Sequence, residues 1–153
     1  MRTAFKALAY VICGLVGLQA ASHAWSSAGV AKYLGEGGTI DMAAEGAPPF
    51  PEAAGFMIHA MTGMFVIPLL ALILLGVSLA AKIPGAAKLA GIVLILTVLQ
   101  VLLGMFGHGM TTLAFLHGLN ALALFAAALL AGRLAGRRRA TSDARVAAPA
   151  GIA

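Results

Sequence analysis

The sequence is poor in charged residues and in cysteine. Only 10% of its 153 residues are Asp, Glu, Lys or Arg, whereas a soluble globular domain carries about 25%. The single cysteine, Cys13, excludes an intramolecular disulfide and lies in an apolar stretch, where it is expected to be a small buried residue. The sequence also lacks a Gly-rich phosphate loop, a nucleophile beside a base, and paired acids within an apolar run. These absences argue against a soluble domain with hydrolytic or phosphate-transfer chemistry.

Long apolar runs dominate instead, since 61% of the residues are hydrophobic. A helix needs about 20 such residues to cross a bilayer. Four runs reach or approach that length: Phe5 to Ser22, Gly55 to Ala81, Leu89 to Gly107, and Met110 to Gly132. We therefore expect an all-α integral membrane four-helix bundle over residues 1–135, with Pro68 kinking the second span. The Arg- and Ala-rich tail over 136–153 is expected to be disordered.

The charges indicate how the bundle is oriented. The basic residues collect at the ends of apolar runs, at Arg2, Lys6, Lys82, Lys88, Arg133, Arg137, Arg138, Arg139 and Arg145. The 24–54 segment holds four of the five acids and only one base, Lys32. Because cytoplasmic loops are rich in Lys and Arg, both termini and the 82–88 turn are predicted to be cytoplasmic, and the 24–54 loop external. The net charge of +5 thus reflects topology and not nucleic-acid binding.

The N-terminus leaves one alternative open. Two early basic residues, an apolar run and the sequence Ala21-Ser22-His23-Ala24 resemble a secretory signal with a cleavage site between small residues. Cleavage after Ala24 would leave three spans and an external N-terminus. An internal repeat favours keeping the first span as a permanent helix.

The chain contains a faint repeat of two helical hairpins. Each half has a glutamine, a histidine and a small polar residue in the same order: Gln19, His59 and Thr62, then Gln100, His117 and Asn120. Spans 1–2 and 3–4 are therefore predicted to be parallel hairpins related by an axis along the membrane normal. A cofactor on that axis would receive one ligand from each hairpin.

His59 and His117 are the leading ligand candidates, because an ionisable side chain inside a span is costly and usually functional. Gly63 and Thr62 share a helix face with His59, and Asn120 shares one with His117, which offers room and polar contacts for a haem. The alternative is that each histidine bonds a neighbouring helix or sits among the headgroups. If Arg133 marks the membrane boundary, the two histidines also lie at different depths.

Four further residues are secondary candidates. His23 and His108 lie at the outer ends of the first and third spans, as interfacial side chains or, for His108, as a contact to a haem propionate. All four histidines gather on one side, but no pair has the i, i+4 spacing that a zinc or copper site on a helix uses. Gln19 and Gln100 are expected to form interhelical hydrogen bonds, with a quinone contact as the alternative.

These residues carry two resemblances. Gln100 in the third span and the run Leu116-His117-Gly-Leu-Asn120-Ala resemble a family of small four-helix bacterial membrane proteins of unknown function. The chain is similar, more remotely, to one half of haem A synthase, whose second and fourth helices each present a histidine to a haem. That resemblance implies haem ligation by His59 and His117. The chain departs from it in having one half, no paired external cysteines, and Ile58 where an acid would precede the histidine.

The functional expectation is a b-type cytochrome-like electron-transfer protein of the bacterial cytoplasmic membrane. It would hold one haem b between His59 and His117, would not be an enzyme on its own, and would work with a redox partner or a larger membrane complex. The alternative is a structural or accessory subunit without a cofactor. A transporter or channel is a weaker third hypothesis that would require homo-oligomerisation, which the sequence leaves open.

Overall fold

The computed structural model describes residues 1–41, 46 and 48–147, with side chains described as far as 136. All regular structure in this part of the chain is helical, as the sequence predicted. The α-helices are α1 (Arg2–Gly35), α2 (Ala54–Met61), α3 (Ile67–Ala80), α4 (Ala86–Gly107) and α5 (Thr111–Ala147). A 3-10 turn, η1 (Pro51–Ala53), precedes α2, and a π-helical segment, η2 (Thr62–Val66), joins α2 to α3.

Four helical stretches of the described residues are long and apolar enough to cross a membrane. They are Arg2–Gly35, Pro51–Ala80, Ala86–Gly107 and Thr111–Gly136. The second stretch combines η1, α2, η2 and α3 into one bent span. This architecture is that of a multi-pass membrane protein.

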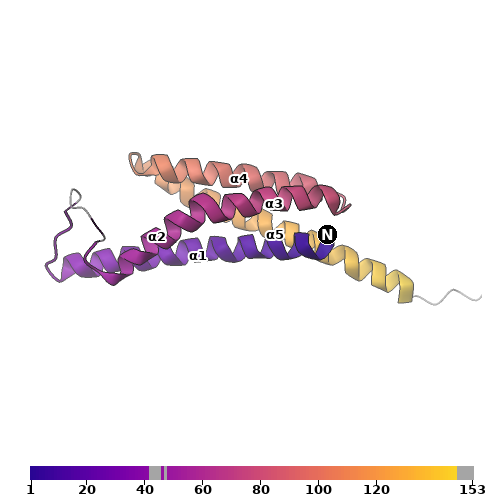
Figure 1. The fold of residues 1–153 in the computed structure, drawn as a ribbon, viewed down its shortest axis with the longest axis horizontal. Helices are drawn as coiled ribbons and strands as arrows, with labels where there is room; N and C mark the ends of the chain where they lie inside the picture. The colour runs from indigo at the N-terminus through magenta and orange to yellow at the C-terminus, as the bar shows by residue number, and fades with distance from the viewer. Residues whose placement is uncertain (42–45, 47, 148–153) are drawn as a thin grey trace, which may run out of the picture.

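The helices form two hairpins that pack side by side (Figure 1). In the first, α1 packs against α2 and α3; in the second, α4 packs against α5. Between the hairpins, α5 packs along α1 and α3 packs along α4. The N-terminus and the α3–α4 turn lie at the same end of the bundle (Figure 1), so the two hairpins run in the same sense, as the repeat predicted.

The packed core occupies only part of the length of the bundle. It is built largely from small side chains, which allow helices to approach closely in lipid, and its fully buried members include Phe5, Ala9, Ile12, Ala71, Leu74, Ala86, Ala90, Val93, Leu124, Ala128 and Ala131. On α4 the last buried residue is Thr97, and on α5 the first is Asn120. The segment η2 has no buried residue, and α2 has only Gly55. On α4 and α5 tight packing therefore ends near His117, whereas on α1 burial continues past Gln19 through Ser22, Ser26 and Gly29.

The second span bends at η2, as the proline predicted (Figure 1). Pro68 has no backbone N–H, so the helix cannot make its regular hydrogen bond to the carbonyl of Met64. The chain accommodates this with a wider π turn over Thr62–Val66. Such turns are frequent at functional sites, and this one begins three residues after His59.

Two helices are longer than the sequence analysis expected. The first span was placed over 5–22, but α1 continues to Gly35. Hydropathy marks where the chain becomes polar, whereas the helix continues because Ser26 and Gly29 pack against residues 50–52. The tail was expected to be disordered from 136, but α5 continues through Ala147, where Ala and Arg favour helix. Residues 148–153 lie outside the described part.

Candidate functional site

The fold brings His59 of α2 and His117 of α5 together between the two hairpins. Their ring centroids lie 6.0 Å apart, with an interplanar angle of 55°. Both side chains are half-buried. The two rings therefore meet in space, although the histidines belong to different hairpins. Each hairpin contributes one imidazole, as the repeat predicted.

Both imidazoles are held by the same kind of bond. His59 Nδ1 lies 3.0 Å from the backbone oxygen of Gln19, and His117 Nδ1 lies 3.0 Å from the backbone oxygen of Gln100. A carbonyl oxygen only accepts hydrogen bonds, so Nδ1 is the protonated nitrogen in each neutral ring. The lone pair is thereby left on Nε2. This is how ligating histidines are oriented in metal sites, with one nitrogen bonded to a carbonyl and the other free to ligate.

The glutamine side chains link the helices within each hairpin. Gln19 Nε2 donates to Thr62 Oγ1, and that hydroxyl donates to the backbone oxygen of Ile58. In the second hairpin, Gln100 Nε2 donates to the backbone oxygen of His117 at 3.0 Å. Gln19 and Gln100 thus make the interhelical bonds expected of polar residues in a span.

The small polar residues of the repeat are occupied by these bonds. Asn120, which is buried, donates through Nδ2 to Gln100 Oε1 at 2.6 Å and to the backbone oxygen of Leu96 at 2.9 Å. Thr62 is occupied by Gln19 and Ile58. Both residues therefore orient the helices that carry the histidines, whereas the sequence analysis assigned them to direct cofactor contacts.

Two glycines make room for the hydrogen-bonded groups. A Cβ atom on Gly63 would lie 2.9 Å from Gln19 Oε1, so the space beside His59 is filled by the glutamine amide. A Cβ atom on Gly104 would lie 3.0 Å from Cε1 of His117. Gly104 was not among the predicted site residues. Its position four residues after Gln100, one helical turn further along α4, is the signal that would have identified it.

His23 lies beside His59, whereas His108 lies apart. The His23 ring packs edge-on against His59 at 5.0 Å and against Phe56 at 5.6 Å between ring centroids. Its Nδ1 lies 3.3 Å from Ser27 Oγ. His108 is exposed in the α4–α5 turn and makes no hydrogen bond or ring contact within the described residues. No group of three or more His, Cys, Asp or Glu side chains in the described part has the arrangement of a metal site.

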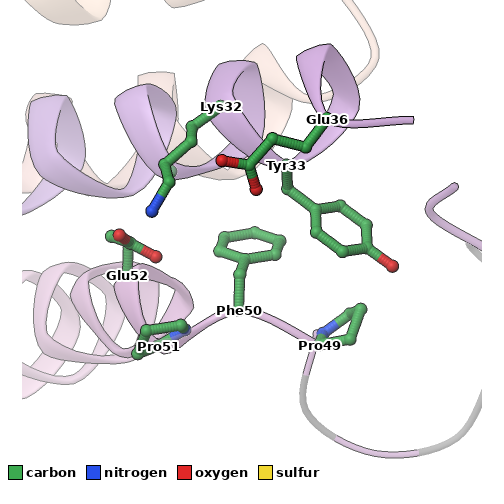
Figure 2. Close-up of a pocket in the computed structure, with 8 residues that line it drawn as sticks. Lys32, Tyr33, Glu36, Pro49, Phe50, Pro51 and Glu52 are labelled. Carbon is green, nitrogen blue, oxygen red and sulfur yellow. The ribbon is translucent and has the colours of Figure 1, made fainter. Parts of the chain in front are cut away.

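A separate pocket of about 290 Å³ lies at the far end of α1 from the N-terminus (Figure 2). In Figure 2 the Phe50 ring lies at its centre, between the Lys32 and Glu52 side chains on one side and Tyr33 on the other. The lining residues are Gly29, Lys32, Tyr33, Glu36, Pro49, Phe50, Pro51 and Glu52. The pocket contains none of the histidines, so it does not belong to the candidate haem site.

Comparison with family models, with curated proteins and with solved structures finds no match for this chain. The two resemblances described above therefore depend on the quoted residues alone.

Proposed function

We propose that the protein binds one haem b between His59 and His117 and transfers electrons as a b-type cytochrome-like membrane protein. One observation carries the proposal. The two imidazoles lie 6.0 Å apart between the hairpins, and a glutamine carbonyl accepts from Nδ1 of each. That arrangement leaves two Nε2 lone pairs available to one iron.

The separation of the rings fits a shared iron. Metal–imidazole bonds of about 2 Å on each side put the ring centroids roughly 6 Å apart. The separation between His59 and His117 is 6.0 Å. Exposed apolar side chains such as Met61 and Phe115 flank this level of the bundle and would offer apolar surroundings to a macrocycle held by the two histidines.

The ligand set favours electron transfer over oxygen binding, because two axial histidines fill the coordination of the iron. A single haem near one face cannot carry electrons across a hydrocarbon core about 30 Å thick. The proposal therefore includes a redox partner. The positive-inside pattern supports cytoplasmic termini, with the histidines towards the external side of a bacterial cytoplasmic membrane.

The absorption spectrum of the detergent-purified protein, oxidised and then reduced with dithionite, tests the proposal. Expression with ample haem should give a Soret band and α and β bands that sharpen on reduction. His59→Ala and His117→Ala should each lose this spectrum, and the exposed His108→Ala serves as the matched control. Stoichiometric low-spin haem in both ligand variants would show that the ligand assignment is wrong.

The second candidate is an accessory subunit without a cofactor. It is favoured because the polar side chains of the site already have hydrogen-bond partners within the protein. Among the described residues, no fully buried side-chain nitrogen or oxygen lacks a hydrogen-bond partner. Gln100 and Asn120 thus bond to each other and to backbone oxygens without a ligand. This candidate predicts a colourless protein in which alanine variants of the histidines impair assembly with a partner and leave the visible spectrum unchanged.

A further inference from the structure

Basic residues from the two ends of the chain meet where α1 begins. A Cβ atom on Gly136 of α5 would lie 3.8 Å from Lys6 Nζ of α1. Arg2 precedes Lys6 by one helical turn on α1, and Arg133 is exposed on α5. Residues distant in sequence therefore form one basic cluster, which comprises Arg2, Lys6 and Arg133.

Two glycines on α5 position this cluster. A Cβ atom on Gly132 would lie 2.8 Å from the Tyr10 ring. The ring can therefore pack against α5 only because residue 132 has no side chain. One turn later Gly136 leaves room for Lys6, whose Nζ is 5.9 Å from the centroid of the Tyr10 ring. Lys6 is thus held between an aromatic ring and the backbone of α5. Its ammonium group is directed to the end of the apolar span.

The cluster has no acidic partner in the described structure. No ion pair is formed by Lys6 or Arg133 within that part of the chain, and four of the five acids precede residue 53. The fifth, Asp143, lies two further turns along α5 from Gly136. Among the residues whose side chains the structure describes, this end of the α1–α5 contact therefore carries positive charge without an acidic partner.

We propose that this cluster binds the phosphate headgroup of an anionic phospholipid. The cluster lies where two apolar spans end, so its ligand sits at the boundary between hydrocarbon and water, and a lipid meets both requirements. Basic clusters between spans are a known form of headgroup recognition. The Lys6 ammonium and the Arg133 guanidinium supply the charge, and the exposed apolar surface beside Tyr10 accommodates an acyl chain. This site is independent of haem binding.

Retention of phosphatidylglycerol by the purified full-length protein tests the proposal. The protein is titrated in phosphatidylcholine nanodiscs that contain increasing phosphatidylglycerol, and bound lipid is counted by native mass spectrometry. Each basic residue near an anionic surface contributes about 1 kcal/mol, so Lys6→Gln with Arg133→Gln should weaken retention roughly 30-fold. Lys82→Gln with Lys88→Gln removes the same charge from the α3–α4 turn at the same end. This control measures the loss caused by a diffuse surface field alone, and it should weaken retention less than the Lys6 and Arg133 pair does.

Three outcomes decide between the proposal and its alternatives. An equal loss in both double variants would mean that the charges act only as a diffuse field, and the site would be rejected. No loss in either would reject it as well. Lys6→Arg, which keeps the charge, should restore retention, and far-UV circular dichroism checks that every variant remains helical. Binding of glycerol phosphate as tight as that of phosphatidylglycerol would show that the acyl chains contribute nothing, which would contradict a lipid as the ligand and indicate a site for free phosphate groups.

Discussion

The two hairpins use the same bond to hold a histidine but differ in almost everything around it. In both, Nδ1 of the histidine lies 3.0 Å from a glutamine backbone oxygen on the neighbouring helix. One turn after the glutamine, the first hairpin has His23 and the second has Gly104. The first also bends through a π turn, whereas α5 is continuous. The proposed function depends on the shared bond, and the differences concern how each histidine is packed.

The difference at Gly104 can be tested by removing the space it provides. Gly104→Val would place Cβ 3.0 Å from Cε1 of His117 and add two methyl groups. Overpacking of this kind destabilises a protein by about 1–3 kcal/mol, and here it should also displace the His117 ring. We expect a lower thermal unfolding midpoint in detergent and loss of the low-spin haem spectrum.

Gly91 on the same helix provides the matched control for this substitution. A Cβ atom at Gly91 would meet nothing within 4 Å, so Gly91→Val should leave both the unfolding midpoint and the spectrum close to wild type. If Gly104→Val behaved like Gly91→Val, the close approach of His117 to α4 would be disproved.

The next largest effect on stability is expected at the side chains that hydrogen-bond the two glutamine amides, Asn120 for Gln100 and Thr62 for Gln19. Asn120 is 8% exposed and donates two hydrogen bonds, while Thr62 is half-buried and lies at the edge of its hairpin. Asn120→Ala leaves Oε1 of the half-buried Gln100 without its donor, which costs about 1–3 kcal/mol. Thr62→Ala should cost less, about 1 kcal/mol. The thermal unfolding midpoints of the two variants, measured side by side, test whether Asn120→Ala is the more destabilising. A larger loss of stability in Thr62→Ala would contradict this prediction.

Of these side chains, His23 is expected to contribute least to the stability of the fold. Its ring packs edge-on against His59 at 5.0 Å, and an aromatic pair of this kind contributes about 0.5–1.5 kcal/mol. His23→Ala should therefore shift the unfolding midpoint slightly and leave the haem stoichiometry unchanged. The second hairpin has Gly104 at the equivalent position, so loss of haem in His23→Ala would mean that His23 is itself part of the ligand set.

The fold could be predicted from the sequence because apolar length determines where a chain crosses a membrane. The positions of the helix ends could not, since α1 extends to Gly35 through packing against residues distant in sequence. The pairing of His59 with His117 followed from the repeat. The 6.0 Å separation of their rings did not, because it depends on how the bent second span packs against α1.

The partners of the site residues were the hardest feature to predict. Each histidine donates to a backbone oxygen. Because every residue has a backbone oxygen, the sequence cannot show which one accepts the bond. The same limit explains why Thr62 and Asn120 were expected to contact a cofactor. Their side chains are polar and correctly placed, but only the three-dimensional structure shows that Gln19 and Gln100 occupy them.

The central claim is that each hairpin supplies one axial imidazole to a single iron. Electron paramagnetic resonance of the oxidised protein, supplied with haem, tests it most directly. Wild type should give a low-spin ferric signal at one haem per chain, and His59→Ala and His117→Ala should each convert the remaining haem to a high-spin signal, with His108→Ala unchanged. A low-spin signal that persists in either ligand variant, or a wild-type protein that takes up no haem, would contradict the account.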